Sequence, residues 1–127
     1  MSTFDLDISR FVKKVGGESN KVVREICLNL FSDITNNTPV RSGRARANWF
    51  ASIGSPSEKT IEYEGPESAA SAAIGRAMPE IAKATGNVFW ISNNLPYIYR
   101  LEFEGWSKQA ESGMVRIAID NTTRDLR

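Results

Sequence analysis

The sequence predicts an α+β fold in one small domain, with N-terminal helices packed on a mainly antiparallel sheet of about three to four strands and with further helices. Three observations predict it. The 127 residues lie inside the usual single-domain range, so residues 1–127 are assigned to one domain. Hydrophobic residues make up 41% and charged residues 24%, an ordinary globular composition. Apolar residues recur at helical spacing early in the chain and in strand-like runs further along.

Two helices are expected in the N-terminal third. Residues 5–15 place apolar side chains close to helical spacing behind an aspartate, which predicts a short first helix. Gly16 and Gly17 interrupt this pattern. A longer apolar stripe over residues 18–35 predicts the strongest helix of the chain. Pro39 then stops it, because proline disfavours helical backbone at the residue before it.

The middle of the chain predicts a hairpin followed by a helix. Residues 47–53 are half apolar and residues 59–64 alternate apolar with charged side chains, so these two runs are expected to pair across the turn at 54–57. Residues 67–85 are rich in alanine, the best helix former, and therefore predict a helix. Pro79 inside it is expected to kink or break that helix unless it begins a new turn.

The C-terminal third predicts a strand and short helices. Residues 87–92 resemble a central strand with apolar groups on both faces. Pro96 suits the first turn of a short helix at 97–103, and residues 105–113 are expected to form an exposed loop. Residues 114–120 fit both a strand alternation and a helical stripe, and the helix is favoured.

Composition excludes several classes of function. Sixteen basic against fifteen acidic residues give a net charge of +1, so no strong global field attracts DNA or an anionic membrane. No run approaches the roughly 20 apolar residues that span a bilayer. The single cysteine, Cys27, cannot form an intrachain disulfide and is expected to be buried and inert. Because histidine, a thiolate cluster and a phosphate-binding glycine loop are all absent, we expect no enzyme, no cofactor and no metal site.

Two carboxylate pairs are candidates for a cation site or for acid–base chemistry. On a strand, Glu62 and Glu64 share one face, but a solvated face is the simpler interpretation. On a helix, Glu102 and Glu104 point about 200° apart and cannot readily act together. We therefore expect all four to be surface or interface charges.

The densest basic segment runs Arg41-Ser42-Gly43-Arg44-Ala45-Arg46-Ala47-Asn48-Trp49. Guanidinium groups bind carboxylates and phosphates bidentately, so the segment fits a solvated loop, a contact with an acidic partner subunit, or a contact with DNA. Its candidate interface residues are Arg41, Arg44, Arg46 and Trp49. A small DNA-binding module that uses the basic loop from Arg41 to Arg46 is the alternative function.

A second segment, residues 93–109, is rich in aromatic residues, a composition typical of protein interfaces. We expect Leu101 and either Ile98 or Tyr97 to be buried instead. The candidate interface residues of this segment are Tyr97, Tyr99, Glu102, Glu104, Trp106, Lys108 and Gln109.

At these two segments the chain resembles the tail-completion or head-tail joining proteins of long-tailed bacteriophages, the group that includes the lambda minor tail protein Z type. The resemblance rests on residues 38–49 and 93–102, followed by 105–110 and 113–116, in the same order and spacing, and it spans most of the chain. It implies a non-catalytic virion protein that completes the head-proximal end of the tail. Some relatives have an acidic residue and a threonine before the motif glycine, where this chain has Arg41 and Ser42. The loop of this chain is therefore more basic than the loop of those relatives.

The resemblance also implies partners and assembly. The partners would be other neck and tail proteins, namely the tail terminator, the tail tube and a head-completion or stopper protein, with no membrane. The protein would reside in the tail or neck of the virion and in the bacterial host cytoplasm during assembly. A heterologous interface can close into a ring, of about six subunits by analogy with tail tubes. We expect the basic loop to meet Glu102 and Glu104 of a neighbour or to lie near the DNA path, and Trp106 to pack into an apolar notch.

Overall fold

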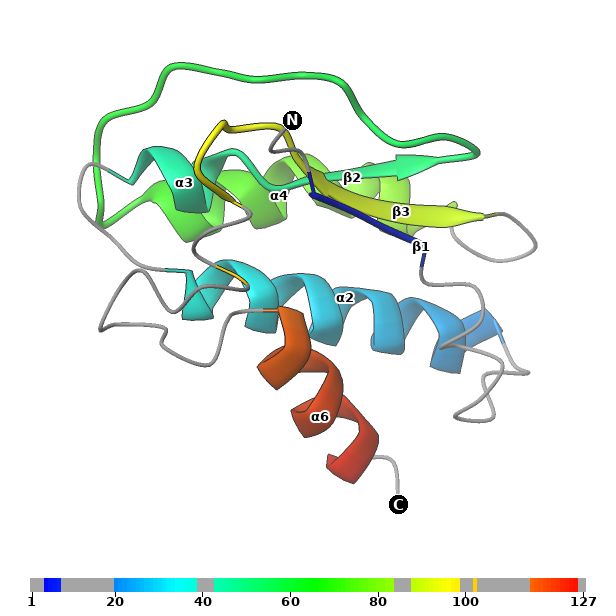
Figure 1. Cartoon of the computed structure of the whole chain (residues 1–127). Helices are drawn as coiled ribbons and strands as arrows, with labels where there is room; N and C mark the ends of the chain where they lie inside the picture. The colour runs from blue at the N-terminus through cyan, green and yellow to red at the C-terminus, as the bar shows by residue number, and fades with distance from the viewer. Residues whose placement is uncertain are drawn as a thin grey trace.

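The structure, a computed structural model, describes residues 4–7, 20–38, 43–83, 88–98, 102 and 115–125. Helices and one antiparallel sheet are combined, so the predicted α+β class is confirmed (Figure 1). The described elements, in chain order, are β1 (Phe4–Asp7), α2 (Asn20–Asn37), α3 (Arg44–Ala47), β2 (Phe50–Ile53), α4 (Ala69–Ile81), β3 (Phe89–Asn93) and α6 (Val115–Asp125).

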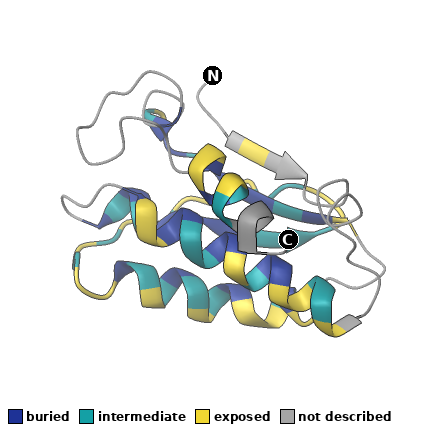
Figure 2. Cartoon of the chain, turned by 90° about the horizontal axis from the view of Figure 1, so that it is seen from below, coloured by how far each residue is buried: buried dark blue, intermediate teal, exposed yellow. Residues whose placement is uncertain are grey.

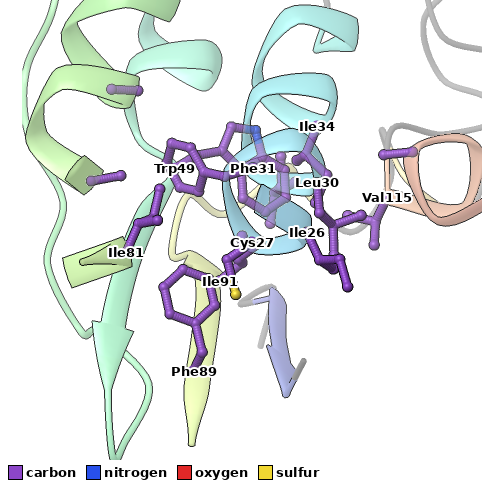
Figure 3. Close-up of a cluster of buried hydrophobic side chains, with 14 of the residues drawn as sticks. Ile26, Cys27, Leu30, Phe31, Ile34, Trp49, Ile81, Phe89, Ile91 and Val115 are labelled. Carbon is purple, nitrogen blue, oxygen red and sulfur yellow. The ribbon is translucent and has the colours of Figure 1, made fainter. Parts of the chain in front are cut away.

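The sheet has three strands in the order β1-β3-β2, and both pairs are antiparallel. The central position of β3 confirms the prediction for residues 87–92. Its side chains alternate between the two faces. Phe89 and Ile91 point toward α2, where they meet Cys27 and Phe31 in the core (Figure 3).

The core lies between the sheet and α2, which is flanked by α4 on one side and by α6 on the other (Figure 3). From α2 come five buried hydrophobic side chains: Ile26, Cys27, Leu30, Phe31 and Ile34. The buried side of α4 carries Ala69, Ala73 and Ala77 at four-residue spacing, which places them on one face. Their small size lets α4 pack closely against both α2 and β2.

The N-terminal strand corrects one expectation. Phe4–Asp7 form β1, with Leu6 opposite Ile91, where the start of a helix over residues 5–15 was expected. The four residues alternate apolar with acidic, and a run this short fits a period of two as well as it fits a helix. Pairing with β3 supplies hydrogen bonds that the local pattern does not reveal. Residues 8–15 lie outside the described residues.

The predicted hairpin between residues 47–53 and 59–64 is wrong. Arg44–Ala47 form α3, β2 pairs with β3, and residues 59–64 form no strand. Residues 54–68, which we call the strap, instead arch back past β2 to the start of α4 (Figure 1). The side chain of Asn48 replaces the missing strand, because its amide bonds both the N–H and the C=O of Ile61.

Most of the remaining expectations agree with the structure. The predicted helix over 18–35 is α2, which extends to Asn37. The helix predicted over 67–85 is α4, but the break expected at Pro79 is absent, because α4 continues through Pro79 to Ile81. The helix interpretation of residues 114–120 is confirmed by α6. Within the predicted helix at 97–103, Ile98 and Glu102 are helical, and Ile98 is buried while Tyr97 is half-buried. Leu101 and the expected loop at 105–113 lie outside the described residues.

Cys27 is fully buried in α2, as expected. Burial raises the pKa of its thiol to about 12, so the thiolate is scarce at neutral pH. In the part of the chain that the structure describes, no helix is both long enough and apolar enough to cross a membrane.

Candidate functional site

Arg46 of the basic segment closes the C-terminal end of α2. Its Nη2 donates to the carbonyl oxygens of Asn36 and Thr38, each at 2.9 Å, and its Nε donates to Thr38 at 3.2 Å. Carbonyls at this end of a helix lack donors from the helix itself and carry its negative dipole. Burial lowers the pKa of this guanidinium. Arg46 is therefore bound within its own chain, not held free for a partner.

Trp49 was expected at an interface, and the structure corrects this: its side chain is fully buried in the core (Figure 3). The indole N–H donates to the hydroxyl of Thr38 at 2.8 Å, and that hydroxyl donates to the carbonyl of Ile34 at 2.7 Å. A buried tryptophan needs an acceptor for its N–H, and Thr38 provides it. The aromatic residue of the motif therefore anchors the end of α2.

Gly43 starts α3 with a backbone that favours glycine. Its φ is +89°, in the left-handed region, and an added Cβ would lie 3.1 Å from both the Cβ of Ala69 and the carbonyl oxygen of Gly65. The motif glycine is therefore required by backbone conformation and by the close approach of α4 and the strap.

Arg44 lies at the surface in a small polar cluster with Glu62 and Tyr97. Its Nη2 is 3.2 Å from Oε1 of Glu62, and the two side chains are 35% and 89% exposed. Burial raises the pKa of Tyr97, the charge of Arg44 lowers it, and the charge of Glu62 raises it. Arg44 and Tyr97 are thus the two predicted interface residues that the structure brings together near the surface.

The asparagines of the second motif tie that motif to the first. The Asn93 amide donates to the carbonyl of Ala45 at 3.1 Å, and its oxygen accepts the N–H of Leu95 at 3.1 Å. Asn94 donates to two strap carbonyls, those of Ser57 at 2.7 Å and Lys59 at 3.1 Å. The two motifs therefore meet in the fold although they are far apart in the sequence.

Glu102 was expected to be a surface or interface charge, and this is wrong: its side chain is fully buried. Its carboxylate accepts the backbone N–H groups of Val115 at 2.8 Å and Arg116 at 3.1 Å. The Arg116 guanidinium donates to the same carboxylate at 3.1 Å and also to the Glu102 carbonyl. A buried carboxylate is stable here because it faces the positive end of α6 and a cation. It is already paired within its own chain.

Six predicted interface residues lie outside the described residues: Arg41, Tyr99, Glu104, Trp106, Lys108 and Gln109.

Arg76 of α4 is a residue that the sequence analysis missed. Its Nη2 donates to the carbonyls of Ala47 at 2.5 Å and Trp49 at 3.0 Å, and the guanidinium lies 4.1 Å from the centre of the Phe50 ring. Burial is the main cause of its lowered pKa. Ala47 is the last residue of α3 and Trp49 directly precedes β2, so Arg76 holds the chain where it passes from α3 into β2. A lone cation in an alanine-rich helix was the signal available in the sequence.

An open groove of about 1150 Å³ lies between β2, the strap and α4. Its charged lining mixes Lys59 and Arg76 with Asp5, Glu58 and Glu80. Mixed signs favour neither a polyanion nor a cation. The described ranges also contain no group of three or more His, Cys, Asp or Glu residues that could hold a metal ion.

No family model, curated protein or solved structure matches this chain. The positions and contacts of the motif residues are therefore the structural observations that bear on the sequence resemblance. In the described ranges these residues form an internal network of hydrogen bonds, with the Arg44–Glu62–Tyr97 cluster at its surface.

Proposed function

We propose that this protein is a structural virion protein of a tailed phage that completes the head-proximal end of the tail and takes part in head–tail joining by ring assembly. It acts without catalysis and without a cofactor. It assembles in the bacterial host cytoplasm and ends in the tail or neck of the virion.

The observation that carries the proposal is the contact between the two motifs on which the resemblance rests. Asn93 of the second motif bonds Ala45 of the first, and Asn94 holds the strap that Asn48 also holds. We call this arrangement the clasp. An accidental likeness would have no reason to select two distant segments that pack on each other. The clasp supports a shared fold, and the function follows by likeness to proteins with the same motifs.

The proposed partners are further copies of the chain in a ring of about six, together with the tail terminator, the tail tube and a head-completion or stopper protein. In the described ranges, Arg44 and Tyr97 are predicted interface residues that stay partly exposed, with Glu62 beside Arg44, whereas the partly exposed Arg46 is bound to main-chain carbonyls. Since Glu102 is paired with Arg116, it is no longer proposed as the acidic partner of a neighbour's basic loop.

The DNA-binding alternative loses support. Arg44 is paired with Glu62, and Arg46 is bound to main-chain carbonyls. Binding to duplex DNA depends on summing several cations against phosphates, and a chain of net charge +1 has few others to add.

The test is deletion of the gene from the phage genome that carries it. We expect electron micrographs to show filled heads and finished tails that have not joined, and wild-type protein supplied in trans to restore infectious particles. An Arg44→Ala/Tyr97→Ala double variant should remain folded and restore fewer particles than wild type. Glu58→Ala, which removes an exposed strap charge, is the matched control. An unchanged titre after deletion, or a block at head assembly, would overturn the proposal.

A further inference from the structure

The strap is fixed to the rest of the protein at two glycines. The N–H of Gly54 donates to the carbonyl of Val88 at 2.8 Å, and the carbonyl of Gly65 approaches Gly43 closely. Both glycines have positive φ, +86° at Gly54 and +133° at Gly65. Glycine enters and leaves this backbone region at little steric cost, so it suits a hinge. We call residues 55–64, between the two glycines, the flap.

The flap has no buried anchor. None of its residues is buried, and the half-buried Pro56, Ile61 and Tyr63 belong neither to the core cluster nor to the side chains that pack against it. In Figure 2 the buried residues lie mainly on the helices and strands. Because burial of apolar surface is the main resistance to local opening, the flap can move with little loss of packing.

Side chains of the neighbouring elements hold the flap in place: those of Arg44, Asn48, Ser52 and Asn94. The two asparagines make two hydrogen bonds each, all to main-chain groups of the flap. Ser52 adds one bond, to the Ser55 carbonyl at 2.7 Å, and Arg44 adds the exposed ion pair with Glu62. Within the described ranges, no hydrogen bond between main-chain groups joins the flap to the rest of the protein.

The flap also forms one wall of the open groove of about 1150 Å³. Residues 55–60 line this space opposite Phe50 and Ser52 of β2 and Pro79 of α4. The space lies directly behind the flap, so the polar tethers, and not packing from behind, set its position. Movement of the flap would therefore change how far the groove opens.

We propose that the flap is a gate, which swings as a unit about Gly54 and Gly65 while the rest of the fold stays intact, and that its opening controls access to the groove. The amides of Asn48 and Asn94 keep it closed. These residues belong to the two motifs of the clasp, so the contact that joins the motifs also holds the gate shut. The motion needs no partner, and it is measurable on the isolated protein whether or not the protein joins phage heads to tails.

Trypsin measures the opening, because Lys59 is the only Lys or Arg in the strap. A protease needs an extended segment in its active site, so it cuts the open flap and its rate follows the open population. We expect the fragment that ends at Lys59 to appear about tenfold faster from Asn48→Ala and from Asn94→Ala, since each variant loses two bonds. The amide of Asn94 bonds only the flap, so this variant stays informative if Asn48→Ala unfolds.

The matched control is Asn29→Ala, at an exposed position of α2, which should be cut at Lys59 at the wild-type rate. Below the global unfolding transition the cleavage rate should be nearly independent of urea, because opening the flap exposes little surface. The cut protein should keep its circular dichroism spectrum. Equal rates in wild type and both tether variants, or a rate that rises with urea as steeply as global unfolding does, would overturn the proposal.

Cysteine labelling tests whether the flap controls the groove. Ser52→Cys places a thiol in the groove, and a bulky maleimide should label it about tenfold faster when Asn94→Ala is added. Val88→Cys is the control, because Val88 is exposed and does not line the groove, and its labelling should not respond to Asn94→Ala. Native Cys27 is buried with a thiol pKa of about 12, so it contributes little background. Equal labelling of Ser52→Cys with and without Asn94→Ala would show that the flap does not gate the groove.

Discussion

The side chain of Asn48 joins α3 to the strap through three hydrogen bonds. Its Nδ2 donates to the carbonyls of Arg44 at 2.8 Å and Ile61 at 2.9 Å, and its Oδ1 accepts the N–H of Ile61 at 2.8 Å. Replacing it tests whether the strap is held by this amide. Two variants are informative, Asn48→Ala and Asn48→Asp.

Asn48→Ala leaves the N–H and C=O of Ile61 without their partner. Each orphaned group costs about 1–3 kcal/mol when buried, and because Ile61 is only half-buried, water recovers part of this. We expect a loss of about 2–4 kcal/mol in the free energy of unfolding. For a chain of this size the melting temperature should fall by on the order of 10 °C.

Asn48→Asp should be more harmful than Asn48→Ala at neutral pH. It keeps the acceptor for Ile61 N–H but turns the donor into a second oxygen that faces two carbonyl oxygens. That repulsion raises the pKa of the new carboxyl in the folded state above its unfolded value. Its protonated form can donate again, so the variant should regain stability as the pH falls and lose it as the pH rises.

Urea unfolding followed by circular dichroism measures both variants, and hydrogen exchange reports on the Ile61 amide. The matched controls are Asn29→Ala and Asn29→Asp, at an exposed position of α2, which should stay within about 0.5 kcal/mol of wild type. If Asn48→Asp equals or exceeds Asn48→Ala in stability at neutral pH, the assigned orientation of the amide is wrong.

Three further outcomes concern Cys27, Glu102 and Pro79. Native Cys27, with a thiol pKa of about 12, should resist alkylation at pH 8 and react fully in urea; rapid labelling of the native protein would contradict its burial. Glu102→Ala should cost about 3–5 kcal/mol and Glu102→Gln less, with faster hydrogen exchange at Arg116; a Glu102→Gln variant as stable as wild type would show that the charge is unimportant. Pro79→Ala should raise the unfolding free energy by about 1–3 kcal/mol because it restores an N–H for the Gly75 carbonyl, and a lower urea midpoint would contradict this.

The elements that the sequence predicted well are those whose pattern is long and local. The apolar stripe of α2 extends over several turns, and the apolar run of β3 lies between recognisable turn residues. Burial of Cys27 followed from its place in the α2 stripe. In these segments the local preference and the packed fold agree, so periodicity is a sufficient guide.

The elements that it predicted wrongly depend on distant partners. Phe4–Asp7 are too short for their period to decide between helix and strand, and β3 decides it by pairing. The alternation at residues 59–64 is real, but the main chain of Ile61 is bonded by a side chain, that of Asn48. No pattern along one segment records which remote group will bond its backbone.

The prediction of the candidate site was limited by a different ambiguity. Trp49 and Arg46 have the composition of interface anchors, yet both serve the C-terminal end of α2. Glu102 looked like a surface charge and instead holds the start of α6. Large side chains with directed hydrogen bonds are used both at interfaces and inside folds, so residue type alone cannot separate the two uses. Arg44 and Tyr97 were placed near the surface as expected.

The clasp has an evolutionary consequence. Asn48 and Asn93 direct their bonds inward, so purifying selection on them would preserve an architecture while leaving outward positions free to diverge. Descendants that keep this signature can therefore adapt to new docking neighbours by changing only the exteriors of α2, α4 and α6. A sequence motif of this kind identifies proteins that share a fold, whereas the choice of binding partner evolves through the surface residues.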